Sequence, residues 1–474
     1  MAWAGCGAGT ADSSTAAIGA HSAASVGASP KASIGANPPA PARSVAREST
    51  AGARRPGPAS RGAAYAVDLG HRIATAELAG LGREIFFDPS LSASGRIACA
   101  GCHDPRHAFA PANGLAVQLA GANGDTPGLR AVPSLRYLQT VPPFSEHFFD
   151  NEGDDSADAG PTGGRTWDGR AGSAHEQAAL PLLSPLEMAG GTPERIVARL
   201  GAAPYAARFR TLWGAGIFDH ADRAFAAAAM ALEVYQEGAA EFQPFSSRYD
   251  AVLRGQASLT AAQARGRAVF EDPARGNCAS CHPSEPGPDG AAPLFSDFGF
   301  VAIGVPRNRR LAANADPSFF DLGLCGPLRE DLRDRPELCG RFRTPSLRNV
   351  ATRRSFFHNG VVRSLDEAVR FYASRDSDPA RWYGRDRAGQ PREFDDLPPR
   401  YRSNVERGAP FGGRPGGPPA LDEGEVSDIV AFLGTLTDAD ALPAAGDERS
   451  PLVGPPTTRS PKERPQTPIS SISR

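Results

Sequence analysis

No run of apolar residues in this 474-residue sequence approaches the length needed to cross a bilayer, so a membrane-spanning helix is not expected. Neither sign of charge dominates. The 51 Lys and Arg residues and 53 Asp and Glu residues leave a formal net charge of −2, which gives no reason to expect nucleic acid or a membrane surface as a partner. No segment alternates apolar and polar residues over the length of a strand. This last absence favours a predominantly helical chain.

Cysteine is also scarce, but its arrangement is informative. Four of the seven cysteines stand in two Cys-x-x-Cys-His motifs, which contain Cys99, Cys102 and His103, and Cys278, Cys281 and His282. This spacing is typical of c-type haem attachment: the two thiols form thioethers with the porphyrin, and the histidine binds the iron as an axial ligand. Two such motifs in one chain predict two covalently bound c-type haems.

The alternatives fit this pattern less well. A zinc site would need four ligands brought together, whereas each motif already ends in its own histidine. A thioredoxin-like motif would lie beside a βαβ pattern, which is absent, and would not require the histidine. Of the other cysteines, Cys325 and Cys339 bracket a short loop. A disulfide is favoured over two free thiols there, because covalent haem attachment in bacteria takes place outside the cytoplasm. Cys6 is left over.

Composition divides the chain into four predicted segments. Residues 1–62 are rich in Ala, Ser, Gly and Pro and are predicted to be disordered, as is a Pro-, Ser- and Thr-rich tail at 441–474. The expected fold class between them is all-α, with two cytochrome c-like haem domains at 63–250 and 251–440 that contain long loops.

Helices are expected where apolar residues recur with the period of an α-helix. Residues 365–372 and 426–433 show this spacing, and 222–237 forms an Ala-rich amphipathic pattern. Ser364 and Glu367 stand where a capping box would begin the first of these helices. In addition, the helical stretches that precede the two haem motifs resemble one another, which suggests a duplicated unit.

Further motifs lie outside the two haem sites: Leu-Gly-Arg-x-x-Phe-Phe-Asp-Pro at 81–89, Trp-Asp-Gly-Arg-Ala at 167–171 with Gln177, Pro181 and Glu187-Met188 after it, Arg-Thr-Pro-Ser-Leu-Arg-Asn-Val at 343–350 and Phe-His-Asn-Gly at 357–360. In these motifs the sequence resembles the bacterial dihaem cytochrome c peroxidase family, which includes the MauG-type enzymes that mature a protein-derived quinone cofactor. The likeness covers about residues 70–437.

The resemblance implies a catalytic set around the N-terminal haem. Glu187 would be the carboxylate above this haem that moves the peroxide proton and assists O–O cleavage. Gln177 would hydrogen-bond in the same pocket, and Pro181 would shape it. Trp167 would lie between the two haems and relay an electron. The plainer alternatives are an exposed charge for Glu187 and core packing for Trp167.

The second haem needs a sixth ligand. Peroxidases of this family supply a methionine, but the chain has only three methionines and none follows the second haem motif. Tyr372 stands at the equivalent place, as in the MauG-type pattern, and its anionic oxygen would stabilise Fe(III). The alternative is that Tyr372 is a core residue. His358 would pack near this haem and hydrogen-bond there.

The first haem should be the one that reacts with peroxide and therefore needs an open distal position. The loop that carries a removable histidine in the peroxidases is rebuilt here between residues 144 and 165 and is rich in acidic residues. His147 is the nearest candidate ligand, and a five-coordinate haem is the alternative. The resemblance also implies a calcium ion held by backbone oxygens at Arg353 and Ser355.

The sequence therefore predicts a periplasmic dihaem peroxidase that reduces hydrogen peroxide. A small donor cytochrome or copper protein would supply its electrons, and the resemblance implies a homodimer. A MauG-type oxidase that acts on residues of a partner protein, and a non-catalytic electron-transfer cytochrome, are the alternatives. No export signal is recognisable, since the first basic residue is Lys31 and no apolar core precedes it.

Overall fold

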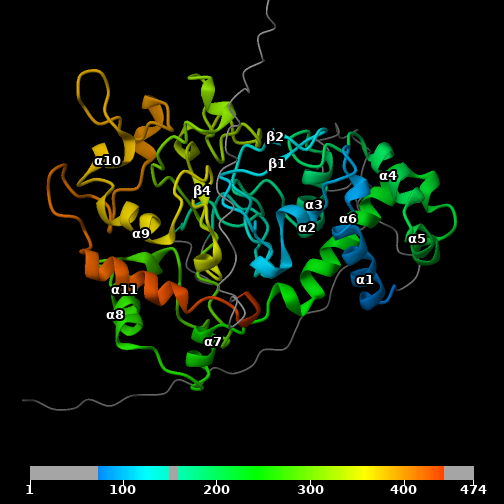
Figure 1. The fold of residues 1–474 in the computed structure, drawn as a ribbon, viewed down its shortest axis with the longest axis horizontal. Helices are drawn as coiled ribbons and strands as arrows, with labels where there is room; N and C mark the ends of the chain where they lie inside the picture. The colour runs from blue at the N-terminus through cyan, green and yellow to red at the C-terminus, as the bar shows by residue number, and fades with distance from the viewer. Residues whose placement is uncertain (1–72, 149–157, 442–474) are drawn as a thin grey trace, which may run out of the picture. The chain divides into compact units, whose positions relative to one another are not determined.

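A computed structural model describes residues 73–148 and 158–441. The predicted N-terminal segment, Cys6, nearly all of the predicted tail and most of the acidic loop residues lie outside this range. Within it the fold is mostly helical, as predicted (Figure 1). The α-helices are α1 (Thr75–Phe86), α2 (Cys99–Cys102), α3 (Ala174–Leu183), α4 (Pro193–Ala202), α5 (Ala206–Trp213), α6 (Ala221–Gly238), α7 (Arg248–Leu253), α8 (Ala261–Glu271), α9 (Leu365–Ser374), α10 (Pro379–Tyr383) and α11 (Glu423–Gly434).

Strands are short and few in the described residues. β1 (Leu119–Ala120) pairs antiparallel with β2 (Thr126–Pro127), and β3 (Phe300–Val301) pairs antiparallel with β4 (Phe342–Arg343). The remaining connections are long loops and 3₁₀ turns. This agrees with the absence of period-two alternation in the sequence.

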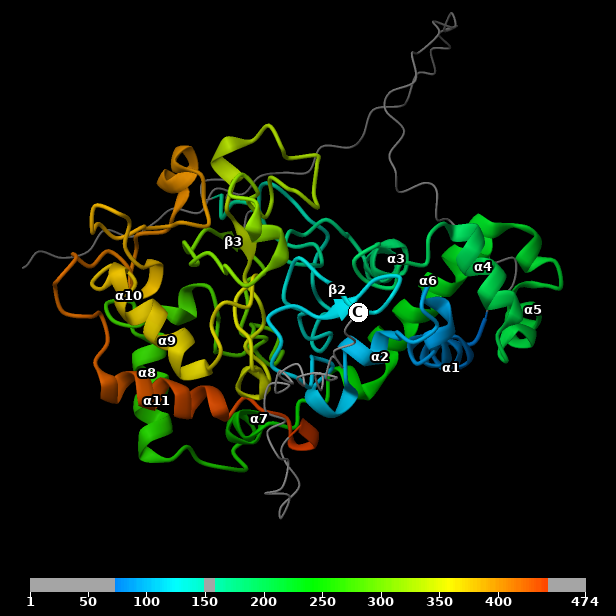
Figure 2. The same cartoon turned by 45° about the horizontal axis from the view of Figure 1, so that its top comes forward.

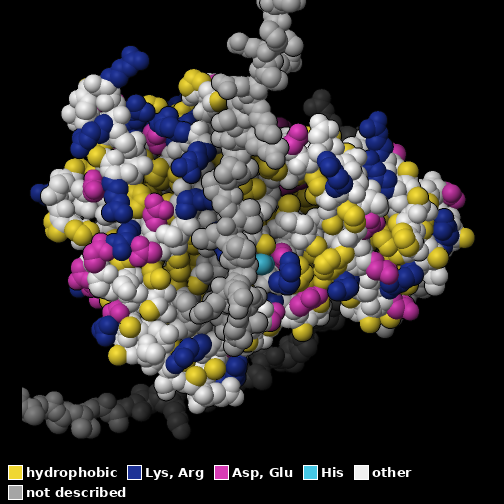
Figure 3. Space-filling view, viewed as in Figure 1, with side chains coloured by type: hydrophobic (Ala, Val, Ile, Leu, Met, Phe, Trp, Pro, Cys, Tyr) yellow, Lys and Arg dark blue, Asp and Glu magenta, His cyan; other side chains and the backbone are white. Residues whose placement is uncertain are grey.

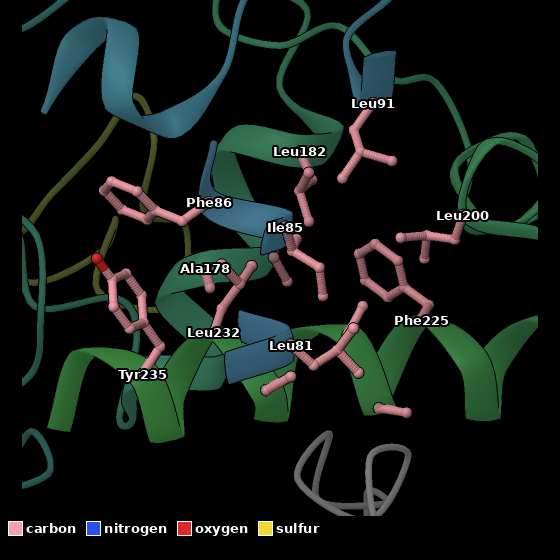
Figure 4. Close-up of a cluster of buried hydrophobic side chains, with 14 of the residues drawn as sticks. Leu81, Ile85, Phe86, Leu91, Ala178, Leu182, Leu200, Phe225, Leu232 and Tyr235 are labelled. Atoms are coloured by element: carbon pink, nitrogen blue, oxygen red, sulfur yellow. The ribbon is translucent and has the colours of Figure 1, made fainter. Parts of the chain in front are cut away.

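The first hydrophobic core forms where α1 packs against α6. The apolar residues of α1 recur at helical spacing, and Leu81, Ile85 and Phe86 are almost completely buried. Figure 4 shows Leu81 and Ile85 on the side of Phe225 of α6, and Phe86 on the side of Tyr235 of the same helix. Further residues of this core come from α3 and α4. The predicted Ala-rich helix at 222–237 is confirmed as α6.

The second core forms around α8, α9 and α11, and α8 and α11 lie side by side in both ribbon views (Figures 1 and 2). α9 and α11 confirm the helices predicted at 365–372 and 426–433. The capping box at α9 is only half formed: Ser364 accepts from the backbone N–H of Glu367, but the Glu367 carboxylate bonds to the N–H of Arg363 instead of that of Ser364. The predicted domain boundaries stay a prediction.

Surface charge is mixed in sign. Acidic and basic side chains are interspersed over the face shown in Figure 3, as the near-zero net charge leads one to expect. No helix of the described part of the chain is both long and apolar enough to cross a membrane.

Candidate haem sites

The first haem motif forms a single helical turn, α2, which is followed directly by His103. His103 Nδ1 lies 3.0 Å from the carbonyl oxygen of Phe109. Burial, with a smaller contribution from the charge of Arg353, lowers the pKa of His103 to about 4, so the ring is neutral. A neutral imidazole that donates from Nδ1 presents the lone pair of Nε2, which is the form that binds a haem iron.

The second motif repeats this arrangement. Cys278 begins a 3₁₀ turn, and Nδ1 of His282 lies 2.7 Å from the carbonyl oxygen of Phe295. Burial lowers the pKa of His282, so this ring also has Nε2 available for a metal. The same local geometry therefore occurs at both Cys-x-x-Cys-His motifs, 179 residues apart in the sequence.

A cavity of about 430 Å³ adjoins the second motif. Cys278, Cys281, His282 and Tyr372 all contribute to its wall. Buried polar atoms on the same wall lack hydrogen-bond partners among the described residues, including Nε2 of His358. Such orphaned atoms are costly unless a ligand satisfies them. The thiols, the free imidazole nitrogen and the orphaned donors together fit a covalently bound haem.

Tyr372 reaches this cavity from α9. Its ring stacks on that of Phe411 at a centroid distance of 5.4 Å. Among the described residues its hydroxyl has no hydrogen-bond partner. Burial raises the pKa of Tyr372, with the neighbouring thiols of Cys278 and Cys281 adding to the effect and Arg375 opposing it. The hydroxyl therefore keeps its proton unless a strong positive charge, such as a ferric iron, binds the oxygen and replaces the proton.

His358 lies on the same wall and is almost fully buried. Its ring stacks flat on Phe342 at 3.6 Å, and Nε2 is 3.7 Å from the carboxylate of Asp396, too far for a hydrogen bond. The backbone carbonyl of His358 accepts from the N–H of Ala131. The structure thus places His358 at the cavity with Nε2 unsatisfied among the described residues, and its role at a haem stays a prediction.

Trp167 lines the cavity from the N-terminal half of the chain. Its indole N–H donates to the carbonyl oxygen of Ala131 at 2.7 Å. Ala131 therefore contacts Trp167 through its carbonyl and His358 through its N–H. This hydrogen bond holds the indole at the wall of the cavity. The backbone of Trp167 leads through a loop to α3.

Asp168, the next residue, is completely buried and organises that loop. Its carboxylate forms ion pairs with Arg130 at 2.7 Å and Arg170 at 2.8 Å and accepts from the hydroxyl of Thr166 at 2.6 Å. Burial alone would raise the pKa of Asp168, but the two arginines and the hydrogen bonds lower it to about 2. Arg130 also binds Asp321 through two nitrogen atoms, which ties the loop to the C-terminal half.

Glu187 follows α3 and lies beside the first haem motif: burial raises the pKa of both Cys99 and Cys102, and the charge of Glu187 adds to the rise. Its side chain is solvent-exposed, yet surrounding protein raises the pKa of the Glu187 carboxyl, and the charge of Arg170 lowers it in part. The structure therefore brings Glu187 next to the cysteines that would hold the first haem.

Gln177 and Pro181 are one turn apart on α3 and both are half-buried. Because proline has no N–H, Pro181 cannot bond to the carbonyl of Gln177 as a helical residue would. The carbonyl of Pro181 accepts from the N–H of Met188, which closes the turn that carries Glu187. Pro181 thus fixes the backbone path from Gln177 to Glu187. The catalytic roles of Gln177 and Pro181 stay predictions.

The rebuilt loop before Trp167 is described only in part. His147 is largely exposed, and its Nδ1 lies 2.6 Å from the carboxylate of Asp158 at the surface. The described residues contain no group of three or more His, Cys, Asp or Glu side chains suited to a metal ion. Ser355 is buried, and Arg353 donates to the carbonyl of Val132 at 3.0 Å. The His147 ligand and the calcium ion stay predictions.

The predicted disulfide between Cys325 and Cys339 is confirmed. Sequence reasoning missed the buried Arg130–Asp168–Asp321 network, because its members are far apart in the chain. It also missed a signal that was visible: Pro-Ser-Leu-Arg occurs twice, at 133–136 and 345–348.

Comparison with known proteins agrees with this geometry. A family model described as "Di-haem cytochrome c peroxidase" matches residues 76–258. The methylamine utilization protein MauG of Paracoccus denitrificans is 35% identical over 80% of this chain and 93% of its own length. The cytochrome c peroxidase Ccp of Escherichia coli is 27% identical over 62% of this chain and 52% of its own length.

Among solved structures, the diheme peroxidase BthA from Burkholderia thailandensis is similar with a TM-score of 0.69 at 39% sequence identity, covering 79% of this chain and 92% of that one. Fold and site define a c-type haem oxidoreductase. The chain belongs to the di-haem cytochrome c peroxidase family, which includes MauG, and the predicted family and fold class are confirmed.

Proposed function

We propose that the protein reduces hydrogen peroxide to water at the haem of the first motif. Each turnover consumes H₂O₂, two electrons and two protons and releases two molecules of water. The observation that carries the proposal is the position of Glu187, a carboxyl with a raised pKa beside Cys99 and Cys102. When bound, the haem iron supplies the site at which peroxide binds and its O–O bond breaks.

Glu187 has the properties of the group that moves the peroxide proton. A raised pKa brings a carboxyl closer to the pH of the medium, where it both accepts and donates a proton efficiently. The charge of Arg170, which is held in place by Asp168, lowers the pKa of Glu187, so this pKa rises less than burial alone would raise it. Gln177 would hydrogen-bond in the same pocket, and Pro181 would set the backbone path between the two.

Electrons would enter at the second haem, held by Cys278, Cys281 and His282 with Tyr372 as the sixth ligand. They would come from a small cytochrome or copper protein and pass through Trp167, which lies on the wall of the second cavity. His358 would donate a hydrogen bond to the haem edge from its unpartnered Nε2. Because covalent haem attachment and disulfide formation take place outside the cytoplasm, the proposed location is the periplasm.

The test is peroxide consumption by the holoprotein with a reduced electron donor, compared with that of Glu187→Gln. General acid–base catalysis contributes about 10²–10⁴-fold, so the variant should lose turnover by that factor and keep both haems. Glu194→Gln, an exposed carboxylate on α4, is the matched control and should behave like wild type. Equal turnover in the Glu187 and Glu194 variants would remove Glu187 from the mechanism.

A second candidate function, MauG-type oxidation of residues in a partner protein, is favoured by Tyr372 at the second haem and by the 35% identity to MauG. It would use the same two haems but draw electrons from the partner's side chains. Peroxide consumption that requires no reduced donor, and instead oxidises an added partner protein, would favour it. Negligible peroxide consumption with two six-coordinate haems would leave only electron transfer.

A further inference from the structure

The sequence Pro-Ser-Leu-Arg occurs once in each half of the chain, at 133–136 and 345–348, and haem attachment alone does not explain it. Both copies lie in loops rather than in helices or strands. Their serines, Ser134 and Ser346, are half-buried and contribute to the wall of the cavity. The two copies make the same pair of hydrogen bonds, and in each half those bonds lead to the haem-motif histidine.

In the first half, the hydroxyl of Ser134 donates to the carbonyl oxygen of Ala108 at 2.6 Å and accepts from the N–H of Arg136 at 3.0 Å. Ala108 directly precedes Phe109, whose own carbonyl oxygen lies 3.0 Å from Nδ1 of His103. Ser134 therefore holds the peptide plane immediately before the carbonyl that orients the histidine.

In the second half, the hydroxyl of Ser346 donates to the carbonyl oxygen of Leu294 at 2.7 Å and accepts from the N–H of Arg348 at 3.2 Å. Leu294 directly precedes Phe295, whose carbonyl oxygen lies 2.7 Å from Nδ1 of His282. The chain of contacts from serine to histidine is thus the same in both halves, although the loops between them differ in length.

The phenylalanines need this support because their backbones are strained. Phe109 and Phe295 both have φ of +54°, in the left-handed region that residues with a β-carbon avoid. Such a conformation is unfavourable and persists only where the surroundings enforce it. Each serine bond fixes the peptide plane on the N-terminal side of the strained residue and so helps to hold its carbonyl in place.

We propose that Ser134 and Ser346 are positioning residues for the two haem-binding histidines. Each acts through the adjacent phenylalanine carbonyl, which sets the ring orientation of the histidine and, by accepting from Nδ1–H, raises the basicity of Nε2. A more basic imidazole is a stronger ligand and favours the ferric iron. The proposal rests on haem attachment at both motifs and is independent of peroxide turnover.

The experiment compares threonine and valine at each position, since these residues have the same shape and differ in the hydroxyl. Holoprotein of Ser134→Thr, Ser134→Val, Ser346→Thr and Ser346→Val is examined by resonance Raman spectroscopy of the iron–histidine stretch and by redox titration of each haem. Ser92→Val is the matched control, because Ser92 also donates to a backbone carbonyl (Pro89, 2.8 Å) and accepts from a backbone N–H (Ile97, 3.2 Å).

The valine variants should lower the iron–histidine frequency or raise the midpoint potential of the haem in their own half, whereas the threonine variants match wild type. Ser92→Val should leave both haems unchanged. The proposal is overturned if threonine and valine give the same spectra and potentials, or if Ser134→Val and Ser346→Val alter the same haem. Should a valine variant fail to retain haem while its threonine counterpart keeps it, the hydroxyl is needed to hold the site and the proposal stands.

Discussion

Gly266 of α8 lies directly against the backbone of Asp428 in α11: a β-carbon on this glycine would be 1.9 Å from the Asp428 carbonyl oxygen. In the first half of the chain Gly82 of α1 has the same relationship to Ala231 of α6, also at 1.9 Å. The two helix pairs therefore cross with their backbones in contact, and a glycine on the helix before each haem motif makes the close approach possible.

Alanine at Gly266 or Gly82 should therefore destabilise the holoprotein. The added methyl group must push two packed helices apart, and overpacking of this kind costs about 1–3 kcal/mol. Gly434→Ala is the control, because nothing lies within 4 Å of a β-carbon at the end of α11. Chemical unfolding followed by circular dichroism measures both effects. A Gly266→Ala protein as stable as Gly434→Ala would contradict the backbone contact.

The buried carboxylate of Asp168 should make stability depend on pH in the acid range. Its pKa is about 2 in the folded protein, below its ordinary value of about 3.9. A depressed pKa contributes stability that is complete above the unfolded value and is lost as the pH falls through the folded one. The contribution is about 2–3 kcal/mol at neutral pH and should disappear between about pH 4 and pH 2.

Asp168→Asn isolates this effect, because it removes the charge and leaves Arg130 and Arg170 without their shared partner. Breaking a buried ion pair in this way costs about 3–5 kcal/mol. Glu84→Gln is the control: it breaks the exposed pair with Arg208, which is worth less than about 1 kcal/mol. Urea unfolding across the acid range distinguishes the two, and equal losses in both variants would contradict the assignment.

The two haem motifs were predictable because their chemistry is local. Two cysteines and a histidine within five residues need no knowledge of the fold, and the helical periods of α6, α9 and α11 are equally local signals. The resemblance added Trp167, Tyr372 and His358, and the structure places all three on the wall of one cavity. It places Glu187 beside the first motif.

What the sequence did not reveal depends on contacts between distant segments. Arg130, Asp168 and Asp321 are ordinary charged residues until the fold buries them together, and no periodicity marks them. The half-formed cap at Ser364 shows a different limit: the spacing predicted a complete capping box, but the Glu367 carboxylate accepts from the N–H of Arg363 instead of that of Ser364. Gly82 and Gly266, and the two copies of Pro-Ser-Leu-Arg, can be recognised in the sequence as duplications. Only the structure shows that the glycines allow close helix contacts and that the serines bond to backbone carbonyls.

Trp167→Phe should slow electron transfer between the haems without changing haem content. Because the indole N–H donates to the carbonyl of Ala131, which is not a base, an oxidised Trp167 would keep its proton. The adjacent carboxylate of Asp168, with a pKa of about 2, does not titrate near neutrality. The wild-type rate should therefore be nearly constant between about pH 6 and 9.

Stopped-flow reduction of the second haem, followed by oxidation of the pair with peroxide, measures this rate. Trp213→Phe on α5 is the control, since that indole belongs to the first hydrophobic core. A Trp167→Phe protein with the rate of the Trp213 variant would exclude the relay. A wild-type rate that rises steeply with pH would mean instead that the indole loses its proton.

Tyr372→Phe should remove the sixth ligand of the second haem. Burial raises the pKa of Tyr372, so the hydroxyl would lose its proton to the solvent only when an iron binds its oxygen. Low-temperature EPR of the oxidised wild type should then show a low-spin signal beside a high-spin one, and the substitution should alter only the low-spin signal. Loss of the anionic ligand should also raise the potential of that haem, because tyrosinate favours the ferric state.

Tyr383→Phe provides the control for this variant. Tyr383 is buried in the same half and donates its hydroxyl to the carbonyl of Gly304, so it is occupied by another partner. Its substitution should leave both EPR signals in place. An unchanged low-spin signal in Tyr372→Phe would show that another group binds the iron, and His358, whose Nε2 is buried and unpartnered among the described residues, would be the first residue to substitute next.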